Sequence, residues 1–166
     1  MGSSRKEILQ RKLKGQSILP GWKIAFEAAA KVTINLDNFL ALEKTEELRN
    51  QFFDLVKSFN NSHQFAPINA LGELSLSLQP KAPQSEVVLF HSMDKYIGAY
   101  LINAETIIKN LEAIWVVTEE DLSFAIPDLA NGFCLERNFY GPNGDYFPDG
   151  LLELTCWGKF GRQASH

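Results

Sequence analysis

The sequence predicts an α+β fold, with N-terminal helices packed on one face of a mainly antiparallel sheet of about six or seven short strands and one inserted helix. Apolar residues recur at helical spacing in the N-terminal part of the chain, whereas the remainder is divided into short apolar runs separated by turn residues. Helices followed by closely spaced strands are typical of proteins in which helices cover an antiparallel sheet.

The helical part is divided by glycine and proline. A basic helix over residues 3–14 is expected to end at Gly15, and a second helix over 17–31 has Pro20 in its first turn. A third helix is expected from about Asp37 or Thr45 to Phe59, and Asn60 and Asn61 follow it. Its predicted buried stripe is Leu48, Phe52, Leu55, Val56 and Phe59.

The strands are predicted over residues 73–78, 86–91, 96–102, 115–118 and 122–126. The alternation ELSLSL indicates the first strand, and a connector over 80–85 leads to the second. Asn103 is expected to cap the inserted helix, which extends to about Glu112.

A β-hairpin is predicted over residues 132–160, because the apolar runs FCLERNF and LLELTCW flank the turn signals GPNG and FPDG. Two registers, one residue apart, fit this turn. In one of them Arg137 faces Glu153 and Phe133 faces Trp157, which supplies a favourable ion pair and aromatic pair across the strands. The hairpin would then present its turn residues as a stiff, exposed arm.

The same register would place Cys134 opposite Cys156. We expect two buried thiols, although a disulfide between the strands is conceivable. The two cysteines do not form a disulfide framework, no apolar run approaches the roughly 20 residues of a membrane span, and no apolar segment follows the charged N-terminus as in a secretory signal. These observations predict a cytoplasmic protein.

The 166-residue chain has an ordinary globular composition, with 45% hydrophobic and 22% charged residues. This length predicts a single α+β domain over 1–166, with residues 1–14 as a basic helix that need not be tightly attached. The net charge is −4 and is unevenly distributed, since residues 1–36 carry seven basic and two acidic side chains whereas residues 115–166 carry three and eight. An acidic C-terminal part argues against nucleic acid as the partner and favours a basic protein.

The usual catalytic and metal-binding motifs do not occur in the sequence. The acids and glycines of the hairpin turn do not match the ligand spacing of an EF-hand, and His63, His91 and His166 lack zinc-site spacing. There is no GxSxG nucleophile motif and no phosphate-binding glycine motif. We therefore assign no catalytic residue, metal or cofactor, and a non-catalytic role is favoured.

The hairpin turn and the preceding turn are the expected binding surface. Aromatic side chains in surface loops are typical anchors of protein interfaces, and the acids around them suit a basic partner. The predicted partner-binding residues are Tyr140, Asp145, Tyr146, Phe147, Asp149, Glu119, Glu120 and Asp121. The favoured hypothesis is a small acidic protein that binds another macromolecule, as an inhibitor or immunity protein masks a basic toxin.

Two alternatives stay open. The first is a small-molecule-binding protein or an enzyme without a recognised motif, with a cleft between the helices and the sheet and with His91, Asp94 and Tyr96 near its edge. The second is a homo-oligomeric structural subunit that associates through an exposed strand edge.

Overall fold

A computed structural model of the chain describes residues 2–59, 63–79, 85–158 and 160. In this part of the chain the helices are α1 (Arg5–Ala30), α2 (Leu42–Ser58), α3 (Leu71–Leu78), α4 (Asp94–Ile97), α5 (Ala104–Lys109) and α6 (Leu111–Val117), with short 3-10 turns η1 (Leu36–Asn38) and η2 (Ile68–Ala70). The strands are β1 (Gln64–Pro67), β2 (Glu86–Phe90), β3 (Tyr100–Asn103), β4 (Asp121–Ala125), β5 (Gly132–Tyr140) and β6 (Tyr146–Trp157). The predicted ends at Asn60 and Asn61, most of the connector over 80–85, and His166 lie outside the described residues.

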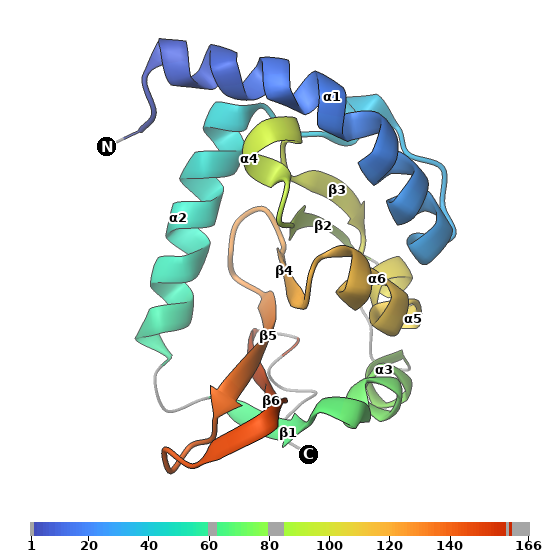
Figure 1. Cartoon of the computed structure of the whole chain (residues 1–166), viewed down its shortest axis with the longest axis vertical. Helices are drawn as coiled ribbons and strands as arrows, with labels where there is room; N and C mark the ends of the chain where they lie inside the picture. Colours follow the sequence, from blue (N-terminus) through green and yellow to red (C-terminus); the bar gives the residue numbers. More distant parts are fainter. Residues whose placement is uncertain (1, 60–62, 80–84, 159, 161–166) are drawn as a thin grey trace.

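The six strands form one antiparallel sheet in the order β1-β6-β5-β4-β2-β3. The predicted α+β class, with helices first and antiparallel strands after them, is confirmed (Figure 1). Both edge strands have four residues, and β1 ends at Pro67 while Phe39 forms a bridge to Tyr100 on β3. Within the described residues no helix is long and apolar enough to cross a membrane.

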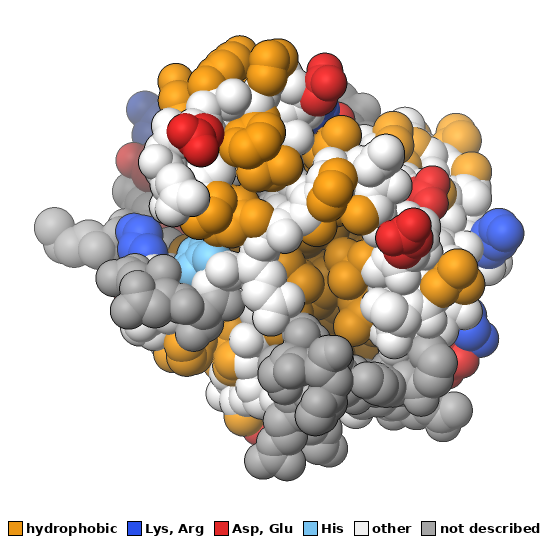
Figure 2. All heavy atoms as spheres, turned by 90° about the horizontal axis from the view of Figure 1, so that it is seen from below, with side chains coloured by type: hydrophobic (Ala, Val, Ile, Leu, Met, Phe, Trp, Pro, Cys, Tyr) orange, Lys and Arg blue, Asp and Glu red, His pale blue; other side chains and the backbone are white. Residues whose placement is uncertain are grey.

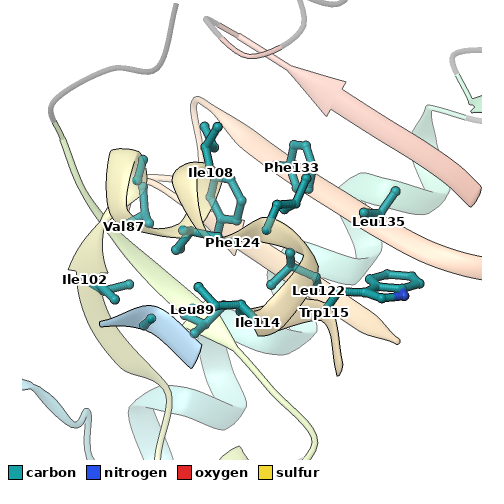
Figure 3. Packing of buried hydrophobic residues seen from close by; sticks show 14 of the residues in the cluster. Val87, Leu89, Ile102, Ile108, Ile114, Trp115, Leu122, Phe124, Phe133 and Leu135 are labelled. Atoms are coloured by element: carbon teal, nitrogen blue, oxygen red, sulfur yellow. The ribbon is translucent and has the colours of Figure 1, made fainter. Parts of the chain in front are cut away.

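The helices cover both faces of the sheet rather than one. On the first face, residues such as Leu89, Phe124 and Phe133 pack against α1, α3, α5 and α6, as Figure 3 shows for part of this core. On the second face, the α2 side chains of Leu48, Phe52 and Val56 pack against a second core, which contains Val88, Phe90, Ala125, Cys134 and Trp157. In Figure 1, α2 lies on one side of the sheet and α5 and α6 lie on the other.

The first two predicted helices are one continuous helix, α1. Gly15 does not end it but marks its closest approach to α4, because a Cβ at this position would lie 2.2 Å from the backbone oxygen of Tyr96. Pro20 lies inside the helix, and the C-cap residue Lys31 has a left-handed conformation (φ 57°). Helix α2 agrees with the third predicted helix, although Thr45 is buried and accepts a hydrogen bond from the backbone of Ala99.

Three predicted strand segments are helical instead. Residues 73–78 belong to α3, whose buried residues Leu71, Ser75 and Leu78 have the spacing of a helix and not of a strand. Residues 115–117 belong to α6, and 94–97 form α4 ahead of the shorter strand β3. Asn103 caps a helix as expected, since its side chain accepts from the backbone N–H of Glu105.

The hairpin β5–β6 adopts the other of the two registers, so the predicted pairs are wrong. Arg137 lies opposite Leu152, Phe133 lies opposite Cys156, and Cys134 lies opposite Thr155. A shift by one residue moves every side chain of a strand to the other face. The observed register brings Leu152, Leu154 and Cys156 to the first core, which already holds Phe133 and Leu135.

The two cysteines are consequently on opposite faces of the sheet and are free thiols. Trp157 lies opposite Gly132, where a Cβ would be 2.1 Å from the indole ring, so the absence of a side chain at Gly132 makes room for the ring. The Trp157 Nε1 group donates to the backbone oxygen of Leu129 at 2.9 Å, which satisfies its polar atom within the core.

Candidate functional site: a row of carboxylates beside an aromatic hairpin tip

Three acidic residues occupy directly opposed positions on three neighbouring strands. Asp121 on β4 pairs with Glu136 on β5, and Glu136 pairs with Glu153 on β6. Side chains at paired positions project from the same face of a sheet, with their Cβ atoms about 4.5–5.5 Å apart. These three half-buried residues, which we call the carboxylate row, lie on the face that carries α2.

The environment of Asp121 and Glu136 disfavours their charged forms. Burial, followed by the nearby carboxylates of Asp121 and Glu153, raises the pKa of Glu136, while His63 acts in the opposite direction. Burial likewise raises the pKa of Asp121, with Arg49 opposing this effect and Asp94 adding to it. Like charges directly opposite one another destabilise a sheet. The stability of the fold therefore does not explain the row.

Hydrogen bonds hold Glu153 at the β6 end of the row. Its Oε1 atom lies 2.6 Å from Nδ1 of His63, the residue immediately before β1, and its Oε2 atom accepts from Asn138 Nδ2 at 2.8 Å. The same His63 nitrogen lies 3.1 Å from Thr155 Oγ1. These contacts connect β1, β5 and β6 and fix the direction of the carboxylate.

An ion pair between the buried Asp94 and the half-buried Arg49 lies near the Asp121 end of the row. Arg49 on α2 donates from Nη1 to Asp94 Oδ2 at 2.6 Å, and this oxygen also accepts the backbone N–H of His91 at 3.0 Å. Burial raises the pKa of the Asp94 carboxyl even though Arg49 opposes the shift. Arg49 is thus bonded to Asp94, while its charge still acts on Asp121.

His91 is a structural residue rather than the edge of a cleft. It is fully buried, and burial lowers its pKa to about 3, with hydrogen bonding to Gly98 opposing the shift. His91 Nε2 lies 2.9 Å from the backbone oxygen of Gly98, and Nδ1 accepts from the backbone of Met93 at 3.2 Å. Asp94 is equally inaccessible, whereas Tyr96 lines a pocket between helices.

The far end of the hairpin carries the predicted aromatic residues at the surface. Tyr140 and Tyr146 pair across the strands with their rings in an edge-to-face arrangement, 5.6 Å between centroids, and each is 58% exposed. Phe147 is also exposed, as are Asp145 and Asp149. We call Phe139, Tyr140, Tyr146 and Phe147 the aromatic tip.

Arg137 joins the aromatic tip to the turn before β4. Its guanidinium contacts the Glu120 carboxylate, with Nη1 2.6 Å from Oε2, and its Nε atom donates to the backbone oxygen of Asp149 at 3.0 Å. The pairing of β5 with β6 is irregular between Asn138 and Tyr140, and Gly150 there has a positive φ of 79°. Arg137 packs against Gly150, so one side chain braces this irregular segment.

The three predicted acids of the turn before β4 have three different environments. Glu119 lines the pocket that also contains Tyr96, Glu120 pairs with Arg137, and Asp121 begins the carboxylate row. Glu119 and Glu120 both have left-handed backbones, with φ values of 59° and 64°, which turns the chain sharply between α6 and β4. The structure therefore brings Asp121 and Glu120 toward the hairpin and places Glu119 elsewhere.

Sequence reasoning missed Glu136, Glu153 and His63 as parts of this site. Glu153 was expected to form an ion pair with Arg137, and only the correct register reveals its position opposite Glu136. The usable signal was the period of two along a strand, which puts Glu136 and Asn138 on one face of β5, and Asn138 in turn donates to Glu153. The regular pairing of β5 with β6 ends at Asn138, one residue before the aromatic tip.

The two cysteines are not activated as nucleophiles. Burial raises the pKa of both thiols, Cys134 and Cys156, to about 12, with the Glu136 carboxylate adding to the effect at Cys134. Both therefore lack the lowered pKa of a nucleophilic cysteine. Across the described ranges no group of three His, Cys, Asp or Glu side chains has the arrangement to hold a metal ion. What the site offers is negative charge beside exposed aromatic rings.

Figure 2 views the molecule from the end that holds β1, the hairpin and α3. Hydrophobic side chains gather over this end with acidic side chains between them, while Lys and Arg lie at its margins. An apolar and acidic surface of this kind is suited to a partner that presents both apolar and basic groups.

A family described as YxiF protein matches residues 26–143 of the chain. The matched span includes Asp121 and Glu136 and ends within the turn of the hairpin, before Glu153. No curated protein and no solved structure matches the chain. Since the match covers more than half of its length, the chain belongs to the YxiF protein family.

Proposed function

We propose that this protein binds a basic protein partner through the carboxylate row and the aromatic tip, in the manner of an inhibitor or immunity protein that masks a cationic active site. Complex formation is then its function, and no chemical step is assigned to it.

The observation that carries this proposal is the direct opposition of Asp121, Glu136 and Glu153 across β4, β5 and β6. Half-buried carboxylates with raised pKa values are a cost to the isolated protein, and perturbed groups of this kind concentrate at functional sites. A cationic side chain placed against the row would lower the pKa of these carboxyls and recover the unfavourable electrostatic energy.

The aromatic tip supplies apolar contact area, which the carboxylates do not provide. Exposed tyrosine and phenylalanine bury large areas on binding and are frequent hot spots, whereas charges mainly set orientation and association rate. Arg137 holds the base of the tip, so little conformational freedom is lost when a partner contacts it.

Affinity capture with three immobilised forms of the protein tests the proposal. The forms are the wild type, the double variant Asp121→Asn/Glu136→Gln, and the control Glu73→Gln/Glu112→Gln. The control removes the same charge from exposed positions on α3 and α6, which cover the first face of the sheet.

We expect the wild type and the control to retain the same basic protein from lysate of the source cell at low ionic strength. Both should release this protein as the salt concentration rises, because salt screens the charges. The double variant should retain much less of it. Identical retention by all three forms would contradict the role of the row. Retention of no basic protein by the wild type would contradict the function itself.

A further inference from the structure

A second site lies between α1, α4 and the end of α6. It is a pocket of about 530 Å³, within the range of about 300–1,000 Å³ typical of small-molecule sites. Its apolar lining comes from Ile18, Met93 and Val117, which pack against the core on the first face of the sheet. The pocket is therefore separate from the carboxylate row, which lies on the second face.

Two lysines from different elements meet at Tyr96 on the pocket wall. Lys14 Nζ lies 4.7 Å and Lys95 Nζ lies 4.9 Å from the centre of the Tyr96 ring, and Lys14 Nζ also donates to the Tyr96 hydroxyl at 3.4 Å. Lys95 and Lys14 together lower the pKa of that hydroxyl. Neither lysine is in an ion pair with a described residue. Three hydrogen-bond donors thus lie around one tyrosine ring.

Trp22 lines the pocket with its indole ring. Its indole is 7% exposed and stacks on Phe26, and the buried Nε1 group has no hydrogen-bond partner among the described residues. A buried N–H without an acceptor is rare and unfavourable in folded proteins. This atom is inaccessible from the pocket, so Trp22 contributes its ring to the lining and not this donor.

The geometry of the pocket depends on the close crossing of α1 and α4. Gly15 lets the backbone of α1 approach Tyr96, and this crossing places Lys14, the preceding residue, beside the tyrosine ring. The cationic cluster is therefore fixed by packing of the backbone and not by flexible side chains alone.

The charges of the lining define the ligand more closely. Lys14 and Lys95 are positive and Glu119 is negative, which leaves one net positive charge at the pocket. We propose that this pocket binds a small organic monoanion, a carboxylate attached to a flat apolar body, with the carboxylate at the lysines and Tyr96 and the apolar body against Ile18, Met93 and Val117.

The probe pair 1-naphthaleneacetate and 1-naphthaleneacetamide tests this inference, because the two differ in charge but hardly in shape. Isothermal titration calorimetry is run on the wild type, on Lys14→Ala/Lys95→Ala, and on the control Lys6→Ala/Lys12→Ala. The control removes the same charge from exposed positions of α1 that do not line the pocket.

We expect one saturable site for the acetate in the wild type and the control, and at least about tenfold weaker binding of the amide. The Lys14→Ala/Lys95→Ala variant should lose about tenfold in affinity for the acetate while its affinity for the amide stays unchanged.

Equal affinity for both probes, or equal losses in the two lysine variants, would overturn the proposal, since binding would then follow apolar contact or overall charge. Absence of saturable acetate binding to the wild type would overturn it as well. The outcome is independent of the proposed partner function, because neither lysine belongs to the carboxylate row or the aromatic tip.

Discussion

Asp121 on β4 lies directly opposite Glu136 on β5, so two acidic side chains occupy one cross-strand position of the sheet. A sheet that is built for stability alone places opposite charges or apolar groups at such positions. Glu153 extends the arrangement onto a third strand. The fold thus holds negative charge together at a fixed place, which is what recognition of a basic group requires.

The buried histidine gives the protein a defined response to acid. His91 has a pKa of about 3 in the folded protein, below its ordinary value of 6.5, because of burial. The unfolded chain therefore binds a proton below pH 6.5 that the folded protein does not, and the contribution of His91 to stability is lost as pH falls from about 6.5 toward 3. Asp94, Asp121 and Glu136 act in the opposite direction, since their pKa values are raised on folding.

Replacing His91 with Gln isolates its contribution. Between pH 6.5 and 4 the free energy of unfolding of the wild type should fall more steeply toward acid than that of His91→Gln. The difference between the two slopes should reach up to about 1.4 kcal/mol per pH unit. Urea unfolding at several pH values measures both slopes. Equal slopes in the two proteins would show that His91 is not buried in its neutral form.

The crossing of α1 and α4 depends on Gly15. Gly15→Ala would place a Cβ 2.2 Å from the backbone oxygen of Tyr96, and the resulting overpacking should cost about 1–3 kcal/mol. Gly21→Ala in the same helix is the matched control, because a Cβ there meets nothing within 4 Å. It should stabilise the protein by about 0.5–1 kcal/mol through helix propensity. Chemical unfolding of both variants measures the difference, and a stabilising Gly15→Ala would disprove the close crossing.

Arg137 is expected to hold the base of the aromatic tip. In Arg137→Ala the contacts with Glu120 and with the backbone of Asp149 are lost. Local stability should fall by about 1 kcal/mol, so that backbone amides in 141–151 exchange with deuterium about five times faster. Hydrogen exchange with mass spectrometry gives this rate, and the peptide of α5 and α6 is the internal reference. Unchanged exchange in 141–151 would mean that the hairpin holds this shape without Arg137.

Tyr146 and Phe147 should contribute to binding and little to folding. Both are exposed, so Tyr146→Ala/Phe147→Ala should change the free energy of unfolding by less than about 1 kcal/mol while weakening partner binding by about 2 kcal/mol or more. The control Leu76→Ala/Val116→Ala removes exposed apolar groups from α3 and α6. Calorimetry with the captured partner compares them, and equal affinities in both variants would exclude the aromatic tip from the interface.

Periodicity predicted most of the fold because most elements are amphipathic. Leu48, Phe52 and Val56 are buried on α2 as predicted, and the hairpin β5–β6 forms where the apolar runs and turn signals place it. Residues 73–78 were wrongly predicted as a strand because polar and apolar residues alternate in ELSLSL. The same residues also fit a helix, since Ser75 and Leu78 lie on one helical face with Leu71. The packing of α3 against α5 and α6 selects the helical period over the two-residue period of a strand. The sequence of a six-residue segment does not reveal these contacts.

The sequence placed the aromatic residues of the candidate site but not the carboxylate row, because the row depends on long-range packing. The exposed aromatic residues could be placed from turn signals alone, but the carboxylate row depends on a register that is ambiguous by one residue. Choosing the register by the favourable pair Arg137 and Glu153 gave the wrong face, because burial of Leu152 and Leu154 in the first core outweighs one ion pair. Packing of these leucines therefore fixes the register that sets Glu136 opposite Glu153, but it does not require acidic side chains at these two positions.

The affinity and stability of one double variant test the carboxylate row most directly. Asp121→Asn/Glu136→Gln removes like charges that oppose each other, so its free energy of unfolding at pH 7 should rise by about 0.2–1 kcal/mol relative to the wild type. Its affinity for the captured basic partner should fall at least about tenfold, with Glu73→Gln/Glu112→Gln remaining close to the wild type in both measurements. A double variant that is more stable and binds weakly is the result we predict. One that binds as tightly as the wild type would contradict a recognition role for the row.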